Sequence, residues 1–366
     1  MLRRTRPRWW YFVPVCAVFL LSSFWLSVQG AEMASRLPER INNLAAPERE
    51  NLLVEGAKKE GAVMWYANWA GDEVEKISQG FKKKYPLINV LVFRGVSGKV
   101  EDKITTEYRA GKHLADVVLA GTSKMALFRE GGIIGRYLSP QVRALQPKLY
   151  DRDGWWVSLA MSPTVIGANT NLVAPQETPK EWRDLLDPKW KGKIGLDTEP
   201  DIMILGMVQA WGDEKTLEFI RALARNQPQI RSGHTLLAQL VAAGELPVGA
   251  ELYGYRVAEL IAKKAPLRMS YPNPAIFSLS PIMTAALPPH PHAAALFYDF
   301  LLSEEGQTII GTDIGRTPVR KGIPARNPEF VKVQESDAFL PLDPLMAGKK
   351  SNEAKRWIKE ILLVRK

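Results

Sequence analysis

Small polar residues follow several apolar, strand-like runs of this chain, where they could bind a small solute. In the first half of the chain these candidate residues are Asn68, Trp69, Ser97, Gly98, Gly121 and Thr122, and in the second half they are Asp197, Thr198 and Tyr253. Hydroxyl, phenol and backbone N–H groups suit carboxylate or phosphoryl oxygens. Such a set would leave most of the hydration energy of a trivalent cation unreplaced. We therefore expect a small anionic or polar organic ligand rather than bare ferric iron.

Several of these candidates also have an ordinary structural role. The serine–glycine pair at 97–98 could cap a helix, and the glycine–threonine pair at 121–122 could form a plain turn. Trp69 could be a packing residue, and Asp197 could be a turn residue. The sequence leaves both interpretations open at each of these positions.

Motifs for catalysis are absent. The sequence contains no G-x-S-x-G, H-E-x-x-H or phosphate-loop pattern. The histidines His113, His234, His290 and His292 do not have the spacing of a metal site or a catalytic triad. Cys16, the only cysteine, lies in the apolar N-terminal segment, so no cysteine chemistry is expected elsewhere. We expect a binding protein without enzyme activity and without a cofactor.

The first 30 residues resemble an export signal. Four arginines occur within the first eight residues, and Trp9 to Val28 is almost wholly apolar. This pattern predicts a secretory signal that is cleaved after Gly30. The apolar run is also near the length of a membrane span, so a retained N-terminal anchor is the alternative. Either way, we expect an extracytoplasmic protein.

The net charge gives a weak indication of the ligand. It is +10 for the whole chain, and loss of the four N-terminal arginines would reduce it to +6. A mildly basic protein suits an anionic ligand, although solubility explains the charge equally well. The sequence shows no basic stripe with interleaved aromatic residues. Nucleic acid is therefore not an expected partner.

Strands and helices alternate along the chain, which favours an α/β fold. In the first half, runs typical of strands at 62–66, 88–93 and 116–119 are separated by helical patterns. This alternation predicts a mostly parallel sheet. A chain of 366 residues is too long for one typical domain. Two extended segments that contain proline, Ser158–Asn169 and Ala265–Ser280, are the predicted crossings between two lobes.

The predicted organisation is two mostly parallel or mixed sheets, flanked by helices and joined by a hinge of two crossings. The expected segments are 1–30 (signal peptide or anchor), 31–55 (tether), 56–162 (first part of lobe one), 163–268 (lobe two) and 269–366 (return to lobe one and C-terminal helices).

Four motifs resemble those of a known family. They are the run Thr178–Thr198, TPKEWRDLLDPKWKGKIGLDT, the helix-stop-strand run from Ser232-Gly233 to Val248, the helix pattern ending at Gln307, and the turn Gly315–Arg320. The chain is similar to the family-1 extracellular solute-binding proteins, the periplasmic receptors of ABC importers, from about Glu60 to Gly322. The resemblance implies a two-lobed, type II-like periplasmic binding protein that closes around its ligand. It also implies an ABC permease as partner, and we expect a monomer.

The resemblance also bears on the tyrosines. Ferric-binding members carry two adjacent tyrosines whose phenolates bind iron. Aligning the chain on Tyr255-Arg256 puts Leu252 and Tyr253 at that pair, so one iron ligand is missing unless Tyr255 compensates. Tyr253 is therefore the main ligand candidate, and Tyr255 joins it only if the ligand is ferric. The alternatives are a ferric-iron receptor and a periplasmic sensor that presents its liganded lobes to a membrane signalling partner.

Overall fold

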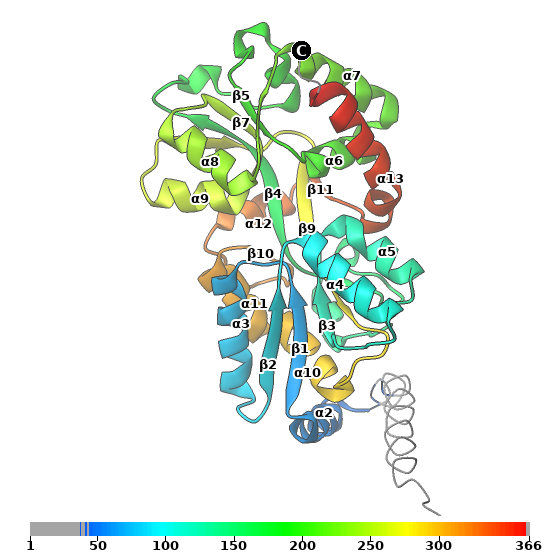
Figure 1. Cartoon of the computed structure of the whole chain (residues 1–366). Helices are drawn as coiled ribbons and strands as arrows, with labels where there is room; N and C mark the ends of the chain where they lie inside the picture. The colour runs from blue at the N-terminus through cyan, green and yellow to red at the C-terminus, as the bar shows by residue number, and fades with distance from the viewer. Residues whose placement is uncertain (1–36, 38–40, 42–43, 364–366) are drawn as a thin grey trace, which may run out of the picture.

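The computed structural model describes residues 37, 41 and 44–363, and Figure 1 shows two lobes stacked end to end. The predicted signal or anchor at 1–30 lies outside the described residues. Among the helices of the described part, none is both long and apolar enough to cross a membrane.

The first lobe contains three parallel strands, with β1 between β2 and β3. Its elements in chain order are α2 (Ala46–Glu60), β1 (Ala62–Ala67), α3 (Gly71–Lys84), β2 (Asn89–Arg94), α4 (Ser97–Arg109), β3 (Val117–Leu119) and α5 (Met125–Glu130). Val74, Ile77 and Phe81 lie on the buried face of α3, because residues three and four apart share one side of a helix. The helix α10 (Pro291–Leu302) packs against α2 and β1, and α11 (Glu304–Thr308) follows it.

The second lobe is built around β5, which pairs in parallel with β6 and β7. Its elements are β5 (Ile194–Asp197), α6 (Asp201–Trp211), α7 (Asp213–Arg225), β6 (Gln229–Arg231), α8 (His234–Ala243), β7 (Val248–Tyr253), α9 (Gly254–Ala262) and β8 (Leu267–Ser270). Gly244 ends α8 in the left-handed conformation, with a φ of 83°, which glycine adopts without a steric cost.

Two long strands join the lobes. The fully buried β4 (Val157–Asn169) pairs with β9 (Ala275–Thr284) along its first half and with β7 and β8 along its second half. The sequence predicts separate sheets, whereas the structure links them through β4 into one ladder with the order β2-β1-β3-β9-β4-β7-β5-β6. The register of β4 is irregular between Ser158 and Met161, and again between Val165 and Gly167.

The hydrophobic cores nevertheless remain separate. Trp65 and Phe297 belong to the core of the first lobe, whereas Trp182 and Ile194 belong to a core of the second. On β9 neighbouring side chains face different cores, because Ile276 packs in the second core, whereas Ala275 and Phe277 pack in the first. The predicted α/β class, with two lobes and a hinge, is confirmed.

The C-terminal part passes the boundary between the lobes once more. After β10 (Thr317–Pro318) and α12 (Pro328–Gln334), the strand β11 (Phe339–Pro341) runs parallel to β9. The helix α13 (Pro344–Trp357) then contributes Ala354 and Trp357 to the second core. The helix α13 therefore packs on both lobes, against α6 of the second and against α5 of the first (Figure 1).

Candidate functional site

Trp69 forms a wall of the candidate site in the first lobe. It follows β1 next to the half-buried Asn68, and only 3% of its surface is exposed. Its indole N–H donates to Ser280 Oγ of β9 at 3.3 Å, and the guanidinium carbon of Arg316 lies 4.4 Å from its ring centroid. Trp69 is thus a packing residue, and its ring also makes a cation–π contact with Arg316.

The other first-lobe candidates lie at two places: Ser97 and Gly98 begin the helix α4, and Gly121 and Thr122 lie at a short turn after β3. Val96 is the N-cap residue of α4, and its side chain makes no capping hydrogen bond. The first turn, which contains Ser97 and the exposed Gly98, therefore has no side-chain cap. In contrast, Gly121 precedes a short 3₁₀ turn, where Thr122 donates its hydroxyl hydrogen to Leu279 O at 2.9 Å. Thr122 therefore ties this turn to β9, as the structural interpretation predicts.

Asp197, at the end of β5, organises the loops of the second lobe. Its carboxylate accepts hydrogen bonds from the N–H groups of Gly233 at 2.7 Å and Glu199 at 2.9 Å. The hydroxyl of Thr198 donates to it at 3.3 Å. Asp197 thus has the turn role that the sequence leaves open, and it also faces His234.

His234 lies between two carboxylates at the start of α8. Its Nδ1 is 3.4 Å from Asp197 Oδ2, and its Nε2 is 3.7 Å from Glu251 Oε1. Glu251 is fully buried; Oε1 accepts from the N–H of Met203 at 3.2 Å, and Oε2 has no hydrogen-bond partner. This is a buried polar cluster, of which the sequence analysis anticipates only Asp197.

The charges of this cluster are linked. Burial raises the pKa of Glu251 to about 7, despite the opposing influence of His234. Burial would lower the pKa of His234, but Glu251, Asp197 and Asp201 together raise it above its ordinary value. Protons are therefore held more tightly here than on exposed groups of the same kind.

Tyr253 stacks on the His234 ring, with centroids 4.5 Å apart and an interplanar angle of 13°. It ends β7, where it pairs with Thr164 of β4, and it is also the N-cap residue of α9. Burial, with Tyr255 and the nearby Glu251 and Asp201, raises the pKa of its phenol. In this environment the phenol keeps its proton.

Tyr255 connects this cluster to the first lobe. Its ring centroid is 6.0 Å from that of Tyr253, and its hydroxyl accepts from Arg316 Nη2 at 3.2 Å. The guanidinium carbons of Arg316 and Arg256 lie 4.5 Å and 5.0 Å from its ring centroid. Both distances are typical of cation–π contacts.

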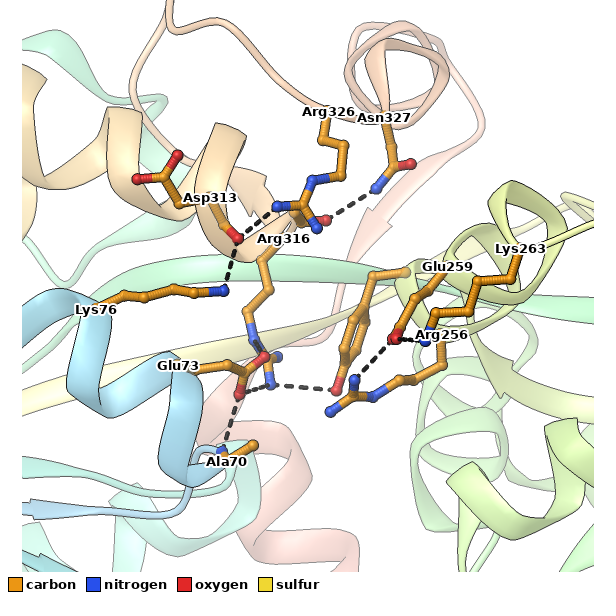
Figure 2. Close-up of polar contacts among 12 residues, drawn as sticks. Ala70, Glu73, Lys76, Arg256, Glu259, Lys263, Asp313, Arg316, Arg326 and Asn327 are labelled. Atoms are coloured by element: carbon orange, nitrogen blue, oxygen red, sulfur yellow. Dashed lines mark hydrogen bonds and ion pairs between the residues drawn. The ribbon is translucent and has the colours of Figure 1, made fainter.

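Arg316 is anchored in the first lobe by Glu73 of α3. Its Nε and Nη2 donate to the two carboxylate oxygens of Glu73, each at 3.1 Å (Figure 2). Glu73 also accepts the N–H of Ala70 at 2.9 Å at the start of α3. The row His234, Tyr253, Tyr255, Arg316 and Trp69 therefore extends from the second lobe to the first.

Comparison with known proteins places this chain in a family. The model of the bacterial extracellular solute-binding protein family matches residues 112–343, more than half of the chain. The chain belongs to this family. It is a periplasmic receptor that binds a small solute and interacts with the permease of an ABC importer, and it is not an enzyme. The predicted receptor function is confirmed.

Relatives of this receptor bind different solutes. Iron uptake protein A1 of Synechocystis is 24% identical over 256 residues, which cover 65% of this chain and 70% of that protein. Iron-bound HitA from Pseudomonas aeruginosa has a TM-score of 0.69 and 21% identity, over 82% of this chain and 99% of that one. AfuA from Actinobacillus pleuropneumoniae, with fructose-6-phosphate bound, has a TM-score of 0.68 and 22% identity, over 83% and 100%. The solved structures share the fold of this receptor.

The sequence analysis misses part of this site. It excludes His234 from any metal or catalytic spacing, and it assigns no role to Glu73, Glu251 or Arg316. In the described residues, no group of three or more His, Cys, Asp or Glu side chains could hold a metal ion. The sequence indicates Arg316 only through its place in the turn Gly315–Arg320, and the neighbouring residues do not reveal its contacts with Glu73 and Tyr255.

Proposed function

We propose that this receptor captures a small anionic or polar organic solute between its lobes, rather than bare ferric iron. The observation that carries the proposal is the pair of guanidinium groups of Arg256 and Arg316 beside the ring of Tyr255. Two cations at this position attract a negative group and repel a trivalent cation. The proposed ligand-binding residues remain Asn68, Trp69, Ser97, Gly98, Gly121, Thr122, Asp197, Thr198 and Tyr253.

Closure of the lobes would complete the site. Ligand contacts from both lobes favour the closed state, because a ligand shifts the equilibrium toward the form that it binds better. We propose 56–162 and 163–268 as the lobe boundaries, a monomeric receptor, and export by the N-terminal segment, which is cleaved or kept as an anchor. The alternative function is that of a periplasmic sensor, in which the closed, liganded lobes would bind a membrane signalling partner.

A ferric receptor is the second candidate. The names of the Synechocystis and Pseudomonas aeruginosa proteins favour it, as does a phenol at the end of β7. Two features oppose it. Leu252, the neighbour of Tyr253, is fully buried in a hydrophobic core, so the adjacent pair of phenols is missing. The Tyr255 hydroxyl already binds Arg316.

Titration of the desalted receptor with ferric citrate separates the two candidates. We expect no phenolate-to-iron charge-transfer band in the visible spectrum, because the neighbouring guanidinium groups repel the metal and burial keeps the Tyr253 phenol protonated. A strong band at stoichiometric iron would contradict the organic-solute proposal and restore the ferric receptor.

Tyr253→Ala should weaken solute binding by at least about tenfold, which is about 1.4 kcal/mol. The reason is that Tyr253 stands between the His234 cluster and Tyr255, so its loss leaves a gap in the wall of the site. The measurement is calorimetric titration with the best ligand from a thermal-shift screen of small anions, organic acids, amines and metals. Tyr255→Phe, which keeps the ring, is the comparison and should change the affinity less. An unchanged affinity for Tyr253→Ala would remove this residue from the site.

A further inference from the structure

We propose that Arg256 binds an oxyanion of the ligand, a phosphoryl or carboxylate group, beside Tyr255, where the two lobes are in contact. This inference rests on the proposed function and narrows its ligand class. Two arginines flank Tyr255, and of these two Arg256 keeps donors for a ligand.

Arg316 is already committed to the protein. Its Nε and Nη2 bind Glu73, and Nη2 also donates to the Tyr255 hydroxyl. Its guanidinium group lies close to both the Trp69 and the Tyr255 rings, and 12% of its side chain is exposed. A ligand could engage Arg316 fully only by displacing Glu73, which would leave a buried carboxylate without its partner.

Arg256 retains donors and is more accessible. Its Nη1 donates to Glu259 at 2.9 Å, whereas its buried Nε has no hydrogen-bond partner. About a quarter of the side chain, 26%, is exposed. Figure 2 shows its guanidinium group turned toward the Glu73–Arg316 pair rather than toward Lys263. A planar guanidinium with unused N–H groups matches the paired oxygens of a phosphoryl or carboxylate group.

The local charges leave one positive charge unbalanced. Glu73 pairs with Arg316, and Glu259 is shared between Arg256 and Lys263. These three cations therefore face two carboxylates. Arg256 also lies in the first turn of α9, which contains no acidic residue and has no side-chain cap. The positive end of a helix is an unfavourable place for a cation unless an anion binds beside it.

The charges on the other side of Tyr253 fix the orientation of the ligand. There the buried carboxylates of Asp197 and Glu251 flank His234, which makes this side less favourable for an oxyanion than the side of Arg256. Glu251 is fully buried and Asp197 is only 4% exposed, so neither carboxylate is an open contact for a solute in this arrangement. The oxyanion therefore belongs at Arg256, and the uncharged part of the ligand extends past Tyr253.

The test uses inorganic phosphate as a probe of the oxyanion position. Binding to the full-length receptor is followed by phosphorus NMR, with Arg256→Gln and Lys263→Gln as a matched pair. Each variant removes one positive charge, from the first turn of α9 or from its C-cap residue, but the Lys263 side chain is 69% exposed and lies beyond Glu259. We expect wild-type binding in the millimolar range, a loss of about tenfold or more for Arg256→Gln, and a change within about twofold for Lys263→Gln.

Arg256→Lys is the control for a loss of binding that results from misfolding, because it keeps the positive charge and can keep the ion pair with Glu259. It should show an intermediate loss, since lysine lacks the planar fork. No phosphate binding by the wild type would overturn the proposal, and so would equal losses in Arg256→Gln and Lys263→Gln. Failure of the proposed function would appear differently: phosphate would bind at Arg256, while the organic acids and phosphate esters of the thermal-shift screen would bind no better than phosphate itself.

Discussion

Glu73→Ala should lower the free energy of unfolding by about 3–5 kcal/mol, because it leaves the guanidinium group of Arg316 without its carboxylate. The pair is well shielded from water, with side-chain exposures of 5% for Glu73 and 12% for Arg316. The substitution also removes the acceptor for the N–H of Ala70 at the start of α3. Urea unfolding followed by far-UV circular dichroism measures the change.

Two further variants test this explanation. Glu75→Ala, on the exposed side of the same helix, should change the stability by less than about 0.5 kcal/mol. A double variant, Glu73→Leu with Arg316→Met, should recover part of the loss, because it replaces the ion pair with apolar contacts. A loss below about 1 kcal/mol for Glu73→Ala would show that Arg316 finds enough solvation without its partner.

The stability of the receptor should fall as the pH rises from about 5 to about 7, and Glu251 should account for much of this fall. Burial holds the pKa of Glu251 at about 7 in the folded protein, against 4.5 for an ordinary glutamate. Between these values the folded protein keeps a proton that the unfolded chain releases, so raising the pH favours unfolding. For this group alone the loss over the range is about 3 kcal/mol.

His234 adds to the effect in the same direction. Its pKa is raised in the folded protein, so its stabilisation is complete below about 6.5 and is lost as the pH rises through the folded value. Unfolding free energies measured at intervals between about pH 5 and pH 8 give the slope. Glu251→Gln should flatten it, while the exposed Glu245→Gln should not. A wild-type slope of zero or of opposite sign would contradict the expected protonation of the cluster.

Local patterns were sufficient to predict much of the first lobe. The strand-like run at 62–66, and Val74, Ile77 and Phe81 at helical spacing, correspond to β1 and α3. The sequence pattern does not predict the helix α6, because it packs on nearly all sides and its consecutive buried residues Met203 to Val208 have no amphipathic period. The sharing of β4 between the lobes depends on pairing between distant strands, which composition and periodicity do not reveal.

The candidate site was predictable where it lies at strand ends, and not where it depends on tertiary contacts. Tyr253 and Asp197 end β7 and β5, as expected for a sheet whose strand ends face a cleft. Arg316 meets Tyr255 from 61 residues away and Glu73 from 243 residues away, so no spacing rule connects them. His234 belongs to the site because α8 begins beside β5 and β7, which carry Asp197 and Glu251.

The continuous ladder through β4 determines how the lobes can move. Because β4 is hydrogen bonded to both halves of the protein, neither lobe can swing on a slack linker. Rotation has to appear as a change of twist between the two irregularities of β4, around Pro163, which has no N–H to donate. There the buried hydroxyl groups of Ser162 and Thr164 have no hydrogen-bond partner. The hinge is thus a paired strand segment, which any rotation of the lobes has to twist.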